Sequence, residues 1–586
     1  MRPPQITFEI PRRLRALVRS REISLVVLAA AIGAGAGLVV GAMSAGVDFL
    51  HRLFFDLAPG QRLSAHALLD PMRALAVPLA GGLLFGLVMA LIARWRAGRE
   101  VDPIEANALH GGRMSFRGSL LVAGQTIWSS GVGASVGLEA GYTQLASGIA
   151  SSIGRKFRLR RGDLRVLVGC GAAGAIAAAF GAPLAGAFYA FELIIGSYSV
   201  ASLAPVGLAA LLGHVMAQAV APASLGIVAA NTAAVAGHDL VIAGILGLLA
   251  AGFGIALMRG VAFCESLFGR ARIPVSLRPA LGGLVVGLLA LASPQVMSSG
   301  HGALHLAGVL DRSLWAIALV FGLKALASVV SLGSGFRGGL FFASLLLGAL
   351  GGQLFASGLS AVWPSLGLDT GAYAIIGMGA LSVSVIGGPL TMTFIALETT
   401  GNFGLTTAVL VAVIIATQVT RETFGYSFAT WRFHLRGETI RSAADVGWIR
   451  DLTVGRMMRH DVRTVPADTT LSAFREAFPL GSTTQVVAVD AEGRYAGLVM
   501  VAEAHAAELA DTGAVGTILH HADDVLLAHM TIKEAVELFD RTEAEALAVA
   551  DSRETRQVVG LLSEAHALRR YAEALELRRR DVLGQA

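Results

Sequence analysis

The chain has 586 residues, of which 54% are hydrophobic and only 15% are charged, and its mean hydropathy is +0.66. This amount of apolar surface excludes a soluble globular protein and indicates a membrane protein. The net charge of +5 does not indicate nucleic-acid binding, because the arginines flank apolar segments and are not interleaved with aromatic residues.

The amino-terminal residues 1–22 are basic and precede the first apolar segment without a small-residue cleavage site. We therefore expect a cytoplasmic arm rather than a removed signal peptide. Apolar segments long enough to cross a bilayer, about 20 residues each, begin at Leu25, Ala74, Leu240, Leu314 and Leu405. The sequence thus predicts a multi-pass helical membrane domain over residues 23–435.

A single carboxylate, Glu139, lies in the stretch GVGASVGLEAGYTQ among glycines, alanines and apolar residues. A charged side chain at bilayer depth costs several kcal/mol, roughly 3 kcal/mol or more, so it indicates a functional site. The alternative is a buried ion pair with a base elsewhere in the domain.

The membrane domain contains an internal repeat. GAPLAGAFYAFEL (181–193) and GGPLTMTFIALET (387–399) share Gly, Pro-Leu, Phe, Ala and Glu at identical spacing. The pattern predicts a duplicated transporter fold with repeats over about residues 23–220 and 240–435, and the alternative is chance similarity between closely packed small-residue helices. Inverted repeats place the ion site between broken helices whose amino ends are partly positive, and glycine-rich stretches suit such ends.

The composition changes after about residue 436, where charged and ordinary soluble sequence begins. We expect a linker over 436–451 and a soluble α/β region over 452–580. Strands such as TQVVAVD (484–490) and ALAVAD (546–551) alternate with helical patterns in two similar copies. Each copy has the order helix–strand–strand–helix, which resembles a cystathionine β-synthase-type (CBS) domain pair.

The motifs GLEAG, APLAGxFxxFE, GGLFFA, GGPLTxxFxALE and YSFATW follow one another and then the CBS-like pair. This order resembles the CLC family of chloride channels and transporters over nearly the whole chain. The resemblance implies an α-helical polytopic protein of inverted-repeat CLC architecture, a homodimer with one pore per subunit, and chloride or another small anion as substrate. Protons are a second candidate substrate, and no enzymatic activity, catalytic residue, metal or other resident cofactor is expected.

The resemblance also assigns residues of the pore by position. Glu139 matches the gating glutamate, whose carboxylate competes with the anion for an amide-lined pocket until it moves away or takes a proton. Further ion-binding positions are implied at Gly137, Leu138, Gly339, Leu340 and Phe341. Tyr426 in YSFATW matches the tyrosine whose hydroxyl donates to the central anion, and the alternative for a tyrosine near a helix end is an interfacial belt residue.

Three residues are expected to modulate the pore, and two of them depart from the family pattern. Leu193 stands where the family's exchangers carry a proton-delivering glutamate, and Glu192 matches the acid before it. A leucine cannot relay a proton, so its presence favours a passive channel. The alternative is a proton-coupled exchanger in which protons take another route. The third residue, Arg337, is unusual in the filter loop GSGFRGG.

Alignment on Pro103 places Glu100 where the family has an anion-binding serine. A carboxylate would repel a bound anion in a low dielectric. Glu100 is therefore protonated, paired with a base such as Arg337, a ligand for an organic or cationic solute, or displaced by a different alignment register.

CBS pairs of this family commonly bind adenine nucleotides, and the positions of the acid that holds the ribose are occupied by Glu503 and His566. Neither is the expected aspartate, although Ser563 keeps the usual Ser or Thr of the second copy, so a structural role in dimerisation is at least as well supported as nucleotide binding. We expect the protein in the cell inner membrane, with the amino terminus and the CBS domains in the cytoplasm.

Overall fold

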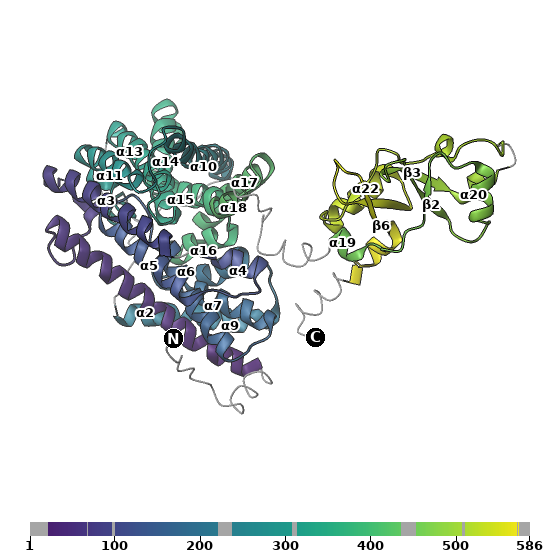
Figure 1. Cartoon of the computed structure of the whole chain (residues 1–586). Helices are drawn as coiled ribbons and strands as arrows, with labels where there is room; N and C mark the ends of the chain where they lie inside the picture. The colour runs from purple at the N-terminus through teal and green to yellow at the C-terminus, as the bar shows by residue number, and fades with distance from the viewer. Residues whose placement is uncertain are drawn as a thin grey trace. The chain divides into compact units, whose positions relative to one another are not determined.

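The computed structural model describes residues 22–66, 68–95, 100–220, 237–307, 313–434, 453–506, 510–570 and 572–573. The chain divides into two compact units, Met1–Asp445 and Val446–Ala586, and each unit is described by itself (Figure 1). The predicted linker 436–451 lies outside the described residues, as does the predicted basic arm except for its last residue.

The described part of the first unit is helical. Its helices are α2 (Glu22–Phe55), α3 (Pro71–Trp95), α4 (Pro103–Leu109), α5 (Phe116–Gly131), α6 (Glu139–Lys156), α7 (Arg161–Phe180), α8 (Pro183–Tyr189), α9 (Val200–Val220), α10 (Gly237–Arg270), α11 (Arg278–Ala292), α12 (His301–Ala307), α13 (Leu314–Gly333), α14 (Phe341–Val362), α15 (Thr370–Ile386), α16 (Pro389–Thr400), α17 (Phe403–Thr423) and α18 (Phe428–His434). Among the described residues, eight helical segments are long and apolar enough to cross a membrane. The prediction of a multi-pass membrane domain is therefore confirmed.

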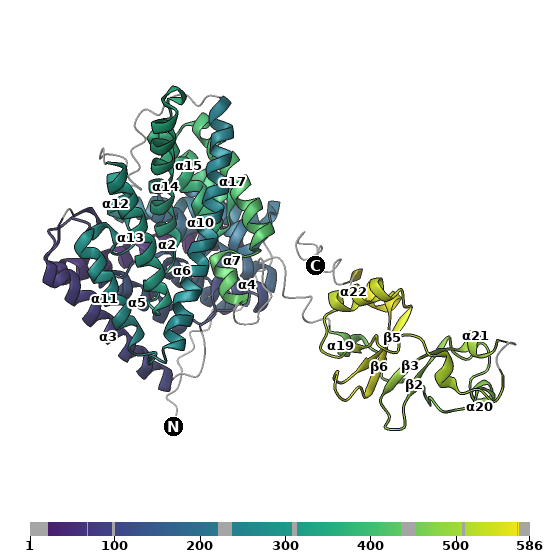
Figure 2. The same cartoon turned by 90° about the horizontal axis from the view of Figure 1, so that it is seen from above.

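The helices form two groups that follow the two halves of the sequence. In the first half, α2, α7 and α9 pack against one another, and in the second half α10 packs against α15 and α17 and α14 packs against α15 (Figures 1 and 2). The groups meet where α3 of the first half packs along α11 of the second, and where α8 contacts α16. Phe180 of α7 also packs its ring against those of Phe341 and Phe342 of α14, at centroid distances of 4.6 and 4.5 Å.

The repeated motif breaks the chain in the same way in both halves. Gly181 and Gly387 end α7 and α15 in the left-handed conformation, with φ of 68° and 84°. Pro183 and Pro389 then occupy the first turn of α8 and α16, where a missing N–H costs no hydrogen bond. The Gly-x-Pro sequence therefore sets both breaks locally.

The glutamates of the two motifs hold the halves together. Glu192 accepts hydrogen bonds from the amides of Leu390 (2.8 Å) and Thr391 (2.9 Å) at the start of α16. Two equivalent amides at the start of α8 donate to Glu398, at 2.9 Å each. Each carboxylate satisfies amides that a helix start leaves unpaired and lies at the positive end of the helix dipole.

The second unit contains two three-stranded sheets of the same topology. One has the order β1 (Thr464–Pro466), β2 (Gln485–Val489) and β3 (Tyr495–Met500), and the other has β4 (Leu526–Leu527), β5 (Ala546–Ala550) and β6 (Val558–Ser563). In both sheets the first pairing is parallel and the second antiparallel. The helices are α19 (Val454–Met457), α20 (Leu471–Ala477), α21 (Val501–Ala504) and α22 (Ile532–Thr542). The predicted duplication and the α/β CBS pair are confirmed.

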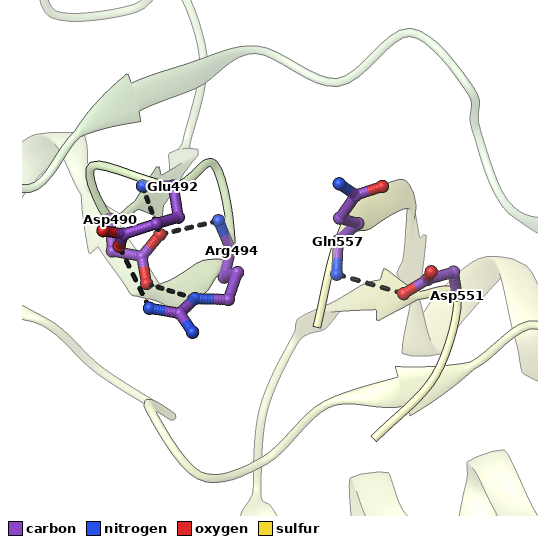
Figure 3. A network of polar contacts seen from close by, with 5 residues as sticks. All are labelled: Asp490, Glu492, Arg494, Asp551 and Gln557. Carbon is purple, nitrogen blue, oxygen red and sulfur yellow. Dashed lines mark hydrogen bonds and ion pairs between the residues drawn. The ribbon is translucent and has the colours of Figure 1, made fainter. Parts of the chain in front are cut away.

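The hairpin turns of the two copies are built around an aspartate that follows the middle strand. Asp490 accepts hydrogen bonds from the amides of Glu492 and Arg494 and from the Arg494 guanidinium, and Asp551 accepts one from the amide of Gln557 (Figure 3). Arg494 and Gln557 form a backbone bridge, so the two hairpins pair with each other.

Candidate ion-binding site

Two loops, one from each half of the membrane unit, meet at Glu139. The amide of Gly137 donates to the carbonyl of Gly339 at 2.9 Å, and the amide of Gly339 donates to the carbonyl of Gly137 at 3.1 Å. This bridge brings together the starts of α6 and α14, which follow the two loops directly. The amides of Gly137 and Gly339 are thus used by the bridge, although both residues are at the predicted site.

Glycine is required at Gly137 by space rather than by its backbone conformation. A Cβ atom at Gly137 would lie 2.1 Å from Oε2 of Glu139, which folds back over the loop. The left-handed positions of the two loops are Gly133 and Gly335, with φ of 89° and 103°. Any side chain at Gly137 would therefore displace the carboxylate.

The Glu139 carboxylate is bound at the amino terminus of α14. Its Oε1 accepts a hydrogen bond of 2.9 Å from the amide of Phe342, and the residue is 4% exposed. No hydrogen-bond donor among the described residues reaches Oε2 in good geometry. Amides in the first turn of a helix have no acceptor in their own helix, and the helix dipole favours an anion there.

A buried base lies near Glu139. Lys324 of α13 is fully buried and interacts electrostatically with Glu139, but the two side chains form no ion pair within the described residues. Its Nζ instead donates to the carbonyls of Val296 (3.1 Å) and Ser298 (2.9 Å). The structure therefore does not show the direct ion pair considered as an alternative for Glu139. The carboxylate instead accepts an amide hydrogen bond, and the base Lys324 lies nearby.

A cavity of about 270 Å³ borders Glu139. Seven predicted residues line it: Glu100, Glu139, Leu193, Arg337, Gly339, Leu340 and Phe341. Arg337 and Glu100 thus share a cavity, but the suggested ion pair between them is not formed in the part of the chain that the structure describes.

A second cavity of about 280 Å³ lies beyond the start of α6 and is lined by Leu138, Tyr142, His51 and His301, among others. Leu138 and Glu139 are consecutive in the chain and face different cavities. Phe342 also lies between the two cavities, because its amide binds Glu139 of the first cavity while its ring packs on His301 of the second. The starts of α6 and α14 therefore form the partition between the cavities.

Some predicted residues do not line the first cavity. Tyr426 packs its ring against Phe424 and Trp431, at centroid distances of 6.3 and 5.6 Å, and the neighbouring helix α18 contributes Arg432 to the lining instead. Glu192 is absent from the lining because its carboxylate caps α16.

Sequence reasoning missed three residues at the site. Phe342 supplies the amide that binds Glu139, one position beyond the predicted filter residues. Thr143 lies one turn after Glu139 on the same face of α6, which helical spacing could have indicated. Tyr189 also lines the cavity and lies within the repeated motif. Its hydroxyl was overlooked because an aromatic residue in an apolar helix is usually a packing residue.

The predicted nucleotide positions lie in both copies of the C-terminal unit. Glu503 of the first copy pairs with His520. Ser563 ends β6, and His566 follows it with Nδ1 3.1 Å from the guanidinium of Arg569. Partial burial, with the nearby Arg569 charge as a further cause, lowers the pKa of His566 below its usual value.

Comparison with known proteins gives a consistent result. The voltage gated chloride channel family matches residues 81–421, more than half of the chain. A ClcB-like protein of Ralstonia nicotianae is 34% identical over 348 residues, covering 58% of this chain and 80% of that protein. The voltage-gated ClC-type chloride channel ClcB of Escherichia coli is 28% identical over 397 residues, covering 67% of this chain and 95% of the relative.

Solved structures share the fold. A slow cyanobacterial Cl⁻/H⁺ antiporter has a TM-score of 0.62 at 22% identity, covering 70% of this chain and 97% of its own. A eukaryotic CLC transporter has a TM-score of 0.58 at 19% identity, covering 94% of this chain and 98% of its own. With the family match, the Glu139 geometry and the CBS pair, these similarities show that the chain belongs to the voltage-gated chloride channel family.

Proposed function

We propose that the protein conducts chloride or another small anion passively, with Glu139 as the gate. The observation that carries this proposal is the Glu139 carboxylate, bound to the amide of Phe342 at the partition between two cavities. Donors at a helix start that hold a carboxylate also suit a small anion. Anion and carboxylate then compete for one position, and displacement or protonation of Glu139 opens it.

Passive conduction, rather than coupled exchange, is supported by two residues of the repeated motif, Leu193 and Glu192. Leu193 lines the first cavity and offers no proton-carrying group. Both oxygens of the neighbouring Glu192 are engaged at the start of α16. Family membership makes the protein a channel or transporter rather than an enzyme, and the antiporters with a similar fold are too distant in sequence to assign proton coupling to this chain.

Besides Glu139, two acids line the cavity, Glu100 and Asp102, together with two bases, Arg337 and Arg432. Glu100 is the one at the predicted anion-binding position, and Arg337 is its candidate counter-charge, whereas a route for a cationic or organic solute would use Glu100 as a ligand. We propose that Arg337 offsets Glu100 through the cavity. Glu100→Arg and Arg337→Glu should each reduce chloride flux, and the double variant should restore part of it; a double variant as inactive as the single ones would count against the pair.

For the rest of the chain we propose a homodimer in the cell inner membrane, with the CBS pair in the cytoplasm. Adenine nucleotide binding near Glu503, Ser563 and His566 stays a prediction, which calorimetry with ATP on the full-length protein can test. His520 already engages Glu503, so ATP would have to displace that contact to use the carboxylate.

The function is tested by ion flux from purified protein in liposomes, with chloride and proton movement recorded together under a chloride gradient. Chloride efflux without proton movement is the expected result. Proton movement driven uphill by chloride would refute passive conduction and leave anion transport intact. If no chloride moved, nitrate, fluoride and monovalent cations would be tried in turn, and movement of cations alone would refute the anion route.

A further inference from the structure

An apolar groove of about 630 Å³ runs between α3 and α5 on the exposed surface of the membrane unit. Its lining comes from α3 between Leu84 and Ile92 and from α5 between Arg117 and Trp128. Leu84 and Leu120 of this lining are exposed. Because α3 is long and apolar enough to cross the membrane, an open apolar groove along it faces the hydrocarbon chains of the bilayer.

The polar side chains inside the groove are already engaged. Nε2 of Gln125 donates to Sδ of Met89 at 3.0 Å, and Nε1 of Trp128 donates to the carbonyl of Gly81 at 3.0 Å. These two contacts show that α3 and α5 run antiparallel, so Arg117 of α5 lies toward the carboxyl end of α3. The groove therefore offers apolar surface along its length and a cation at one end.

The groove is about as long as one leaflet of a bilayer is thick. From Trp128 to Arg117 the helix α5 rises about 16 Å, and a hydrocarbon core is about 30 Å thick in total. In the proposed topology the carboxyl end of α3 faces the cytoplasm, because α2 and α3 cross the membrane in succession from a cytoplasmic amino terminus. The groove thus lies in the cytoplasmic leaflet, with Arg117 at the level of the lipid headgroups.

Arg117 also lines a second pocket, of about 1000 Å³, between the start of α5 and the last two turns of α6. This basic pocket contains three more exposed bases, Arg113, Arg155 and Lys156. No acidic residue of the described part of the chain lines it, and none of the four bases forms a salt bridge among the described residues. The guanidinium of Arg155 donates to the hydroxyl of Ser152 at 3.4 Å. Positive charge that no acid offsets attracts an anion.

We propose that the groove and the basic pocket together bind one anionic phospholipid of the cytoplasmic leaflet. An acyl chain lies along α3 and α5, and the phosphate of the headgroup lies among the four bases. Arg117 belongs to both parts and marks the point where the chain meets the headgroup. Basic pockets between membrane helices on the cytoplasmic side suit anionic headgroups, and the groove adds the contact that a free phosphate cannot make. The site is separate from both ion cavities and does not depend on the proposed function.

The test is native mass spectrometry of the full-length protein in a non-ionic detergent, titrated with phosphatidylglycerol or with phosphatidylcholine that carries the same acyl chains. Wild-type protein should bind phosphatidylglycerol in preference. One base near the membrane surface raises the affinity for an anionic lipid by about 5-fold, so Arg117→Gln should weaken phosphatidylglycerol binding by about that factor and leave phosphatidylcholine unchanged. The matched control is Arg270→Gln, which removes an exposed arginine in the last turn of α10 and should bind as the wild type does.

A second variant tests the acyl-chain part of the site. A Cβ atom at Gly124, in the lining of the groove, would meet no atom within 4 Å. Leucine also favours a helix more than glycine does, so Gly124→Leu fills the groove without disturbing α5. This variant should weaken the binding of both lipids. Its control is Gly322→Leu on α13, where a Cβ atom would also meet nothing within 4 Å and lipid binding should not change.

Equal affinity of the wild type for the two lipids would overturn the inference, as would unchanged phosphatidylglycerol binding in Arg117→Gln or in Gly124→Leu. Inorganic phosphate that displaced phosphatidylglycerol at equimolar concentration would assign the pocket to a free anion. A changed oligomeric state in Gly124→Leu would assign the groove to a contact between copies of the chain. Either of these two results would also overturn the inference.

Discussion

Removal of the Glu139 carboxylate should increase chloride flux. In the closed arrangement the carboxylate accepts the amide hydrogen bond of Phe342, at 2.9 Å in a buried site. A hydrogen bond to a charged acceptor contributes about 1.5–3 kcal/mol. Because 1.4 kcal/mol is a factor of about ten, its loss in Glu139→Ala shifts the balance between closed and open site by about 10- to 150-fold. Flux should rise by up to that factor.

The matched control is Glu139→Gln, which keeps the shape of the side chain and an amide oxygen that can accept from Phe342. A neutral hydrogen bond contributes about 0.5–1.5 kcal/mol, so this variant should lie between the wild type and Glu139→Ala. The assay is initial chloride efflux from liposomes at equal protein content, with melting temperatures measured in detergent. A Glu139→Ala protein that folds normally and conducts no faster than wild type would refute the gate.

Three further predictions concern groups that stabilise one of the two units from within. Glu192→Gln and Glu398→Gln should each destabilise the membrane unit by roughly 1–3 kcal/mol, because each weakens hydrogen bonds to a charged acceptor, and both should lower the melting temperature. A changed ratio of proton to chloride flux in Glu192→Gln would contradict a purely structural role for Glu192. Lys324→Met leaves two buried carbonyls without a hydrogen-bond donor, which should lower the free energy of unfolding by about 1–3 kcal/mol for each carbonyl. An unchanged melting temperature would contradict this. The amide of Arg494 holds the pKa of Asp490 below its usual value, so the charged form stabilises the hairpin at neutral pH. That stabilisation is lost as the pH falls from the usual pKa of an aspartate toward the lower pKa of folded Asp490. Hydrogen-exchange protection of the turn should decrease over the same pH range in the wild type but not in Asp490→Asn.

Local sequence features explain the parts of the fold that could be predicted. Apolar length predicted the membrane segments, and the similarity of residues 181–193 to residues 387–399 predicted two equivalent halves, in which α8 and α16 both follow a Gly-x-Pro break. Strands 484–490 and 546–551 were predicted within one residue of β2 and β5. The isolation of Glu139 among small residues indicated the site, because the cost of a buried charge is a property of that residue and its surroundings.

The directions of side chains at the site could not be predicted in the same way. Sequence position favoured Tyr426 for the cavity, whereas Tyr189 lines it, and the amide of Phe342, one residue beyond the predicted Phe341, donates to Glu139. Glu192 appeared to be a pore residue, but its carboxylate binds the opposite half of the molecule.

The sequence by itself thus determined the membrane class and the duplication, and it singled out Glu139 as the candidate gating residue. Composition, periodicity and turn chemistry act over a few residues and can be read in order along the chain. Only the tertiary structure decided which donors face Glu139 and which tyrosine lines the cavity. These depend on how α6, α8 and α14 pack, and the residues concerned are separated by up to 203 positions in the chain.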